Sequence, residues 1–288
     1  MRRGDRRLGD YQMLLLPGGF YLAILIRWMR LGFRSPRAPF SPIAPEYQHA
    51  FRQEVLMPIL QHHFHAELLQ TENLPDRAQP LLVVINHAGM CFPWDFLSLG
   101  TLLSLERNWV VQPVAHPLFF DHPWLKWWLP AGWPQTLGGV RAERNDLETA
   151  VAHLPEQTVL LYAPEGWRGL AKGWPQRHHL ATFDPSFVQL SNRYEMPILP
   201  VVCLGSEYLH PYAWNFKRLA QALKLPVFPI SPLVIPFILF PSMGVWASRS
   251  HLRYVIQPLY QPWQLTDGKP VGRSESYALS QGLRSSFQ

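Results

Sequence analysis

Cysteine is scarce in this chain. Cys91 and Cys203 are the only two among 288 residues, so no disulfide framework exists and we expect a reducing, cytoplasm-facing location. Two short histidine clusters lack regular metal-ligand spacing, and we predict no metal site and no cofactor. These clusters are made of His62, His63, His65, His178 and His179. No Gly-x-Ser-x-Gly sequence occurs, which argues against a serine hydrolase that uses this motif.

Charged residues are also few. They make up 16% of the chain, against about a quarter in ordinary soluble proteins, whereas hydrophobic residues make up 48% and aromatic residues 13%. The net charge is nevertheless +6, which suits an anionic partner such as a nucleic acid or a membrane surface. The sequence contains no recognisable nucleic-acid-binding motif, and its basic residues gather around apolar segments. We therefore expect a membrane lipid as partner and no nucleic acid.

A long uninterrupted hydrophobic run is missing too. Met13–Ile26 is uncharged, but its 14 residues fall short of the roughly 20 that a spanning helix needs. Arginines flank it on both sides, namely Arg2, Arg3, Arg6, Arg7, Arg27, Arg30, Arg34 and Arg37. We predict that residues 1–45 form a membrane-associated helical segment, monotopic on the cytoplasmic face, and not a cleaved signal peptide.

A second apolar segment, Leu225–Trp246, carries no charge over 22 residues. Its five prolines exclude a regular spanning helix, because each removes a backbone donor and clashes with the preceding turn. They are Pro226, Pro229, Pro232, Pro236 and Pro241. We predict an apolar, proline-rich loop that faces the membrane or covers an acyl chain. The alternative is a buried connection packed against a sheet.

Strand-like and helix-like segments alternate along the rest of the chain. Apolar runs predict strands over residues 81–85, 109–114, 158–162, 198–204 and 253–256. Capping patterns predict helices from Asn145 to Leu154 and from Asp184 to Asn192. This order predicts an α/β fold with a mixed, mostly parallel sheet flanked by helices, in one main domain of residues 46–280. The serine-rich last dozen residues are expected to be frayed.

Leu81–Asp95, LLVVINHAGMCFPWD, is the most informative segment. Leu81–Ile85 is typical of a fully buried strand, and His87 follows at the strand end where open α/β sheets bind ligands. A histidine with a carboxylate partner can take a proton from a hydroxyl near neutral pH. We predict that His87 is a general base and that Asp95 is its partner. The alternative is that the two residues only form a turn and a helix cap.

Three later segments, together with this one, resemble the motif blocks of a known family. Asn86–Asp95 resembles the first block, and Gly138–Arg144, GGVRAER, the second. Pro164–Gly169, PEGWRG, resembles the third, and Pro197–Val202, PILPVV, the fourth. The family is the glycerolipid or lysophospholipid acyltransferase superfamily, with its His-x4-Asp signature. The four blocks occur in the family's order.

The resemblance implies an O-acyltransferase of phospholipid biosynthesis, with residues 46–280 as its catalytic domain. The acyl thioester donor would be acyl-CoA or acyl-carrier protein, and the acceptor would be lysophosphatidate or another lysophospholipid. Arg144 and Arg168, in the second and third blocks, would contact phosphate, because a guanidinium fits phosphate oxygens. Their alternative is a surface salt bridge. Glu165 would orient the acceptor, and Gly166 would permit close backbone approach.

The chain departs from the family pattern in the first three blocks, and in the second Glu143 replaces the usual aspartate. Seven residues separate His87 from Asp95 where the family has four, and Trp167 stands where the third block usually has threonine. The longer spacing keeps two other functions open: a neutral acceptor such as diacylglycerol or a long-chain alcohol, and a catalytically inactive lipid-binding protein. Cys91, four residues from His87, is a further candidate nucleophile, which an acyl-enzyme burst would reveal.

Overall fold

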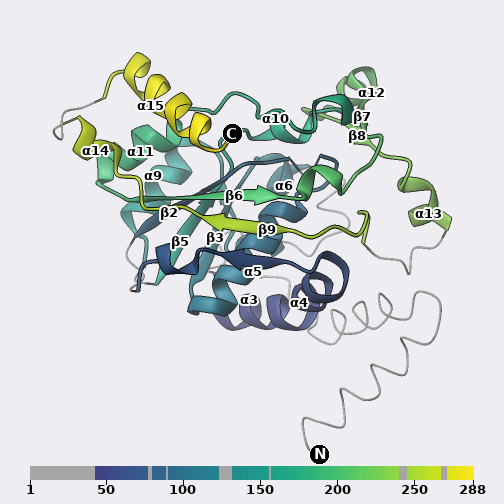
Figure 1. Cartoon of the computed structure of the whole chain (residues 1–288), viewed down its shortest axis with the longest axis horizontal. Helices are drawn as coiled ribbons and strands as arrows, with labels where there is room; N and C mark the ends of the chain where they lie inside the picture. Colours follow the sequence, from purple (N-terminus) through teal and green to yellow (C-terminus); the bar gives the residue numbers. More distant parts are fainter. Residues whose placement is uncertain are drawn as a thin grey trace, which may run out of the picture.

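The computed structural model describes residues 43–76, 80–88, 90–122, 132–155, 157–239, 245–266 and 271–288. Its centre is a seven-stranded sheet of order β1-β9-β6-β2-β5-β3-β4 (Figure 1). The strands are β1 Glu67–Leu69, β2 Leu81–Ile85, β3 Val110–Ala115, β4 Val140–Arg141, β5 Thr158–Tyr162, β6 Ile198–Leu204 and β9 Arg253–Ile256. A separate antiparallel pair joins β7, Trp214–Asn215, to β8, Pro229–Ile230.

Strand β2 lies at the centre of the large sheet. It pairs in parallel with β5 on one side and with β6 on the other, and β3 and β4 continue the parallel part beyond β5. On the other side β9 pairs with β6 in antiparallel orientation, and β1 pairs in parallel with β9. The sheet is therefore mixed and mostly parallel, which confirms the predicted fold class.

Both faces of the sheet are buried. Successive side chains of β2 point to opposite faces, because a strand has a period of two. Leu81, Val83 and Ile85 belong to one apolar cluster, and Leu82 and Val84 belong to the other. All five are fully buried, which explains why the strand reads as an unbroken apolar run.

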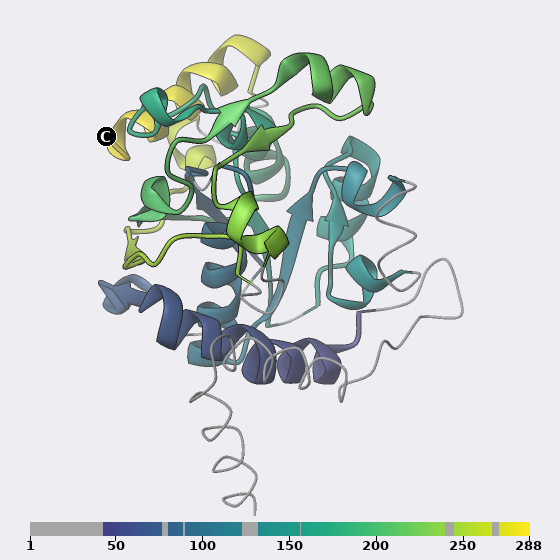
Figure 2. The same cartoon turned by 90° about the vertical axis from the view of Figure 1, so that its right-hand side faces the viewer.

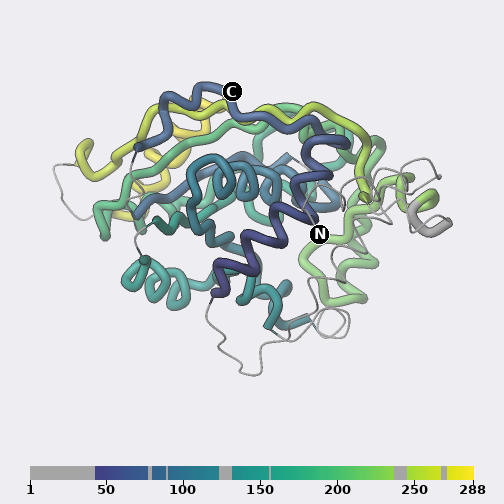
Figure 3. Tube along the Cα trace, turned by 90° about the horizontal axis from the view of Figure 1, so that it is seen from below, coloured from purple at the N-terminus to yellow at the C-terminus, as the bar shows by residue number. Residues whose placement is uncertain are grey.

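Helices cover both faces. Under the first face runs one continuous helix of residues 45–64, formed by α3 Pro45–Phe51, η2 Arg52–Leu56, α4 Met57–Ile59 and η3 Leu60–Phe64, in which η2 and η3 are π-helical. Figure 3 shows this purple helix crossing the sheet from below. Its buried side chains belong to the same apolar cluster as those of α5, Trp94–Arg107. The second cluster takes in α11, Ser186–Tyr194, and α15, Arg273–Ser286.

Short helices fill the connections. They are η4 Thr71–Asn73, α6 Leu118–Asp121, α8 Trp133–Thr136, α9 Arg144–Ala152, α10 Trp167–Leu170, η5 Trp174–Gln176, η6 Ser206–Tyr208, α12 Lys217–Ala222, α13 Val234–Leu239 and α14 Pro262–Leu265. Figure 2 shows α12, β7 and β8 on the side of the molecule opposite the helix of residues 45–64.

Several predicted boundaries are close to the observed ones. The strands at 81–85, 158–162, 198–204 and 253–256 are confirmed, and the strand predicted at 109–114 lies one residue later. The two predicted helices are α9 and α11, each within two residues of its predicted bounds. The prediction of a frayed C-terminus is wrong. Leu283 of α15 and Phe287, the residue after this helix, are both buried in the second cluster.

The two predicted membrane segments have different outcomes. Residues 1–42, including Met13–Ile26, lie outside the described residues. Within the proline-rich segment, residues 225–236 hold β8 and the start of α13, and none of their apolar side chains is buried. Most of them are half-buried, and Val245, near the end of the segment, is buried in the first apolar cluster. The membrane-facing loop and its alternative, a buried connection, therefore both stay predictions. Among the described residues, the helices are too short or too polar to cross a membrane.

Candidate active site

His87 and Asp95 meet despite the lengthened spacing. The imidazole Nδ1 lies 3.0 and 3.1 Å from the two carboxylate oxygens of Asp95. Because a carboxylate only accepts hydrogen bonds, Nδ1 carries the proton and Nε2 is left as the basic nitrogen. His87 lies two residues after the end of β2 and is 5% exposed. The geometry is that of a base held by an acidic partner.

Asp95 is fixed from several directions. It lies in the first turn of α5 and not in a loop, with its carboxylate fully buried. The backbone N–H groups of Ala88 and Phe96 donate to its oxygens at 3.1 and 2.8 Å. These donors and the positive end of the helix dipole favour an ionised carboxylate. The Tyr254 hydroxyl donates to the backbone carbonyl of Asp95 at 2.9 Å, which ties β9 to the site.

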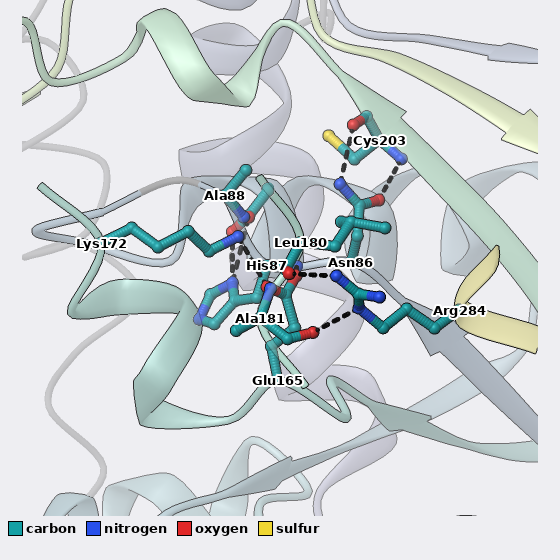
Figure 4. Close-up of polar contacts among 10 residues, drawn as sticks. Asn86, His87, Ala88, Glu165, Lys172, Leu180, Ala181, Cys203 and Arg284 are labelled. Carbon is teal, nitrogen blue, oxygen red and sulfur yellow. Dashed lines mark hydrogen bonds and ion pairs between the residues drawn. The ribbon is translucent and has the colours of Figure 1, made fainter. Parts of the chain in front are cut away.

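Glu165, which lies three residues after the end of β5, holds the backbone of His87. One carboxylate oxygen accepts the backbone N–H of His87 at 2.8 Å. The other accepts the backbone N–H of Ala181 at 2.5 Å and lies 2.6 Å from the Lys172 ammonium (Figure 4). Glu165 is 1% exposed. Both oxygens are thus engaged by groups of the protein itself, and the predicted contact of Glu165 with an acceptor stays a prediction.

Two glycines of the third block have different functions. Gly166 has φ +53° and ψ −143°, a backbone conformation that side chains disfavour, and the space beside it is open. Gly169 is crowded instead: a Cβ there would lie 2.4 Å from the carbonyl oxygen of His87. Only glycine lets α10 approach the His87 backbone this closely. Gly169 was not among the predicted site residues, although it lies within the third block.

Side-chain bonds from distant segments hold the loops around this centre. The Asn86 side chain both donates to and accepts from the backbone of Cys203, at 3.1 and 2.6 Å, so the end of β2 is joined to β6. The Arg284 guanidinium, from α15, donates to the carbonyls of Leu180 and Ala181 at 2.7 and 3.0 Å. Figure 4 shows both sets of bonds beside His87 and Glu165.

A pocket of about 820 Å³ lies next to the third block. One wall comes from residues 167–181 and the other from residues 215–226. Arg168, one of the two predicted phosphate contacts, lines this pocket together with Lys172 and Lys217. Neither lysine was among the predicted site residues. Neither lies at a matched motif position, and the fold alone brings them beside Arg168.

Arg144, the other predicted phosphate contact, lies elsewhere. Its side chain is 82% exposed at the start of α9 and donates to Glu148 at 3.1 Å. Glu148 also accepts from Arg193 at 2.6 Å. Arg144 does not line the pocket. This arrangement is the surface salt bridge that was the alternative for Arg144, and its contact with phosphate stays a prediction.

The structure does not support a cysteine nucleophile or a metal site among the described residues. Burial raises the pKa of the Cys91 thiol to about 12, so the thiol stays protonated near neutral pH and is a poor nucleophile. Cys203 is fully buried in β6, and burial raises the pKa of its thiol as well. Among the residues that the structure describes, no group of three or more His, Cys, Asp or Glu side chains is placed to hold a metal ion.

Comparisons with known proteins agree with the four motif blocks. The model of the family described as Acyltransferase matches residues 65–232. An uncharacterized protein of Mycobacterium tuberculosis is 30% identical over 230 residues, which cover 79% of this chain and 58% of that protein. An uncharacterized protein of Mycobacterium leprae is 29% identical over 231 residues, covering 79% and 56%. The chain therefore spans less than two thirds of these relatives' length.

Among solved structures, the 1-acyl-sn-glycerophosphate acyltransferase of Thermotoga maritima superposes with a TM-score of 0.48 at 16% identity. The superposition covers 99% of this chain and 97% of the other. The family match includes His87, Asp95, Glu165 and both walls of the pocket. Because this match extends over more than half of the residues, it shows that the chain belongs to the acyltransferase family.

Proposed function

We propose that this protein transfers a fatty acyl group from an acyl thioester to a hydroxyl of a glycerolipid. The observation that carries the proposal is the pairing of His87 with Asp95 at 3.0 Å in a chain of the acyltransferase family. A thioester is already activated, so the reaction needs a base for the attacking hydroxyl and no covalent enzyme intermediate.

His87 is the general base in this proposal. Its Nε2 takes the proton of the acceptor hydroxyl while the oxygen attacks the thioester carbonyl. The new C–O bond forms, the C–S bond breaks, and the departing thiolate takes the proton back from the imidazolium. Asp95 holds Nδ1–H in place at 3.0 Å and stabilises the imidazolium, as an aspartate does in a hydrolase triad.

The proposed acceptor is a lysophospholipid such as lysophosphatidate. Arg168 supports this choice because it lines the pocket beside the third block, and a guanidinium binds phosphate oxygens through two parallel hydrogen bonds. In this proposal Gly166 leaves room for the substrate, since no atom lies within 4 Å of where its Cβ would be. The donor is acyl-CoA or acyl-carrier protein, and neither a metal nor another cofactor takes part.

We also propose that the protein works as a monotopic enzyme on the cytoplasmic face of a membrane. Exposed apolar side chains between residues 208 and 235 support this, and they are Tyr208, Tyr212, Trp214, Phe216, Leu219, Leu223 and Ile235. Each of these side chains is at least 41% exposed. Aromatic side chains are enriched at the level of lipid headgroups, and such side chains would bring the pocket close to a lipid acceptor.

Radiolabel transfer tests the proposal. Detergent-solubilised protein is incubated with labelled acyl-CoA or acyl-carrier protein and, separately, with lysophosphatidate, other lysophospholipids or diacylglycerol. We expect label in a lysophospholipid product, and we expect the His87→Ala variant to lose it. His153→Ala is the matched control, because His153 is exposed at the end of α9. Label in diacylglycerol alone would move the acceptor to neutral lipids, and no label with any pair would favour an inactive lipid-binding protein.

A further inference from the structure

Glu165 is engaged by three groups of the protein through its two carboxylate oxygens. One oxygen accepts the backbone N–H of His87 at 2.8 Å. The other accepts the backbone N–H of Ala181 at 2.5 Å and lies 2.6 Å from the ammonium of Lys172 (Figure 4). Only an ionised carboxylate suits all three, because an amide or a protonated carboxyl group would point a donor at one of them. The contact with His87 therefore depends on the negative charge of Glu165.

This negative charge is buried and needs a positive partner. The Glu165 side chain is fully buried, and the Lys172 side chain is 6% exposed. A carboxylate that is taken out of water is costly unless it is paired and hydrogen-bonded. Among the described residues, Lys172 is the ion-pair partner of this carboxylate. The two backbone N–H groups carry no full charge, so Lys172 provides the charge that balances Glu165.

Lys172 and Arg168 have different surroundings, although both line the pocket beside the third block. Arg168 is exposed, whereas the Lys172 ammonium is directed at Glu165 inside the protein. The proposed contact with the acceptor phosphate therefore belongs to Arg168. Lys172 is left with a partner that belongs to the protein itself.

Lys172 belongs to the segment that packs against the His87 backbone. It lies two residues after α10, and its backbone N–H donates to the Gly169 carbonyl at 3.4 Å. Gly169 allows α10 to approach the His87 carbonyl oxygen, and Lys172 reaches the carboxylate that accepts the His87 N–H. This segment thus holds the His87 backbone, whereas Asp95 holds the imidazole.

We propose that Lys172 is a positioning residue for His87 and acts through Glu165. The inference rests on the proposed function, in which His87 is the general base. The Lys172 ammonium stabilises the Glu165 carboxylate, the carboxylate holds the His87 backbone, and the backbone places Nε2 where it meets the acceptor hydroxyl. Lys172 touches neither the acyl donor nor the acceptor. The alternative is an ion pair that only stabilises the fold.

Selective labelling tests this contact without any reaction. The full chain is labelled with ¹⁵N-histidine, and the backbone amide signal of His87 is identified by its loss in His87→Ala. Lys172→Gln keeps a donor but removes the charge, so we expect it to weaken the bond from the His87 N–H to Glu165 and to move this signal. Lys224→Gln is the matched control, because Lys224 is exposed and does not line the pocket. An unmoved His87 signal in folded Lys172→Gln protein would overturn the proposal.

A double-mutant cycle tests whether Lys172 acts through Glu165. Initial rates of acyl transfer are measured for Lys172→Gln, Glu165→Gln and the double variant, each well below its Tm. We expect Lys172→Gln to lower kcat by about 10- to 100-fold, as a misplaced base does, and to leave KM for both substrates unchanged. Lys224→Gln should keep the wild-type kcat.

The double variant should be no slower than Glu165→Gln alone, because the effects of residues that act as a unit do not add. Losses in kcat that multiply would mean that Lys172 acts independently of Glu165. A higher KM for either substrate with kcat unchanged in Lys172→Gln would mean that Lys172 contacts that substrate. Either result contradicts the proposal.

The double variant also answers a failure of the single variants to fold. Removing one partner of a buried ion pair is strongly destabilising, whereas replacing both leaves no unpaired charge. We therefore expect the double variant to fold even where Lys172→Gln or Glu165→Gln does not, and to keep a low kcat. A folded double variant with the wild-type kcat would show that the pair only stabilises the fold.

The labelling experiment keeps this inference separate from the proposed function. A His87 signal that depends on Lys172, in a protein that transfers no acyl group, would support the positioning contact and contradict the reaction. Acyl transfer by a wild type whose His87 signal and kcat do not respond to Lys172→Gln would support the reaction and contradict the positioning role.

Discussion

Replacing Gly169 with alanine should displace His87, the proposed general base. The new Cβ would lie 2.4 Å from the His87 carbonyl oxygen and 2.8 Å from its Cβ, whereas ordinary contacts begin near 3.4 Å. The His87 backbone must therefore move by about 1 Å. A misplacement of about 1 Å can cost on the order of 100-fold in rate, so we expect Gly169→Ala to lower kcat by about that factor, or roughly 2.7 kcal/mol in the barrier.

The assay is acyl transfer from labelled acyl-CoA, with a thermal melt of the same sample. Overpacking costs about 1–3 kcal/mol of stability, so the variant should stay folded with a lower Tm. Gly282→Ala in α15 is the matched control, because no atom lies within 4 Å of the added Cβ. Its activity should equal that of the wild type. A folded Gly169→Ala protein with kcat within twofold of the wild type would refute the reasoning.

Three further variants test the site. Asp95→Asn keeps the shape but replaces the carboxylate that faces Nδ1 with a neutral amide, whose NH2 group can donate to Nδ1 and favour the wrong tautomer. Initial rates should show kcat lower by about 10³–10⁴-fold with little change in KM, and a change in KM alone would count against the role of Asp95. Cys91→Ala should retain turnover without any acyl-enzyme burst. In the wild type, the rate at which Cys91 is alkylated, followed by mass spectrometry, should increase only as the pH rises toward the raised pKa of this thiol, about 12. Arg144→Gln should raise the KM for the acceptor less than Arg168→Gln does, because Arg144 forms an exposed ion pair with Glu148, and such a pair contributes under about 1 kcal/mol. Equal increases in KM would indicate that Arg144 also contacts the phosphate.

The sequence predicts the centre of the sheet better than its edges. Strands β2, β5 and β6 are apolar runs buried on both faces, and that burial is what makes them recognisable. Strands β1 and β4 have three and two residues, too few to show a pattern. The helix of residues 45–64 escaped prediction because η2 and η3 change its turn length, which disturbs the 3.6-residue period that marks a helix.

The candidate site shows a similar division. His87 and Asp95 are close in the chain, so their pairing could be predicted from the sequence. The seven residues between them do not keep the two side chains apart. The partners of Glu165 could not be predicted in the same way. Lys172 and Ala181 follow it by 7 and 16 residues, and no periodic pattern links these positions. They meet because α10 and the segment after it fold back over the end of β2.

The antiparallel strand β9 has a consequence for how the protein is made. β9 inserts between β1 and β6, yet Arg253–Ile256 lies beyond residues 65–232 of the family match. During synthesis β1 is made early, but β9, its only neighbouring strand in the described sheet, is made more than 180 residues later. Tyr254, which anchors the Asp95 backbone, arrives equally late. A nascent chain stalled before residue 253 would carry the His87–Asp95 pair on an unfinished sheet, so acyl transfer by stalled chains should appear only once residues 253–256 have left the ribosome.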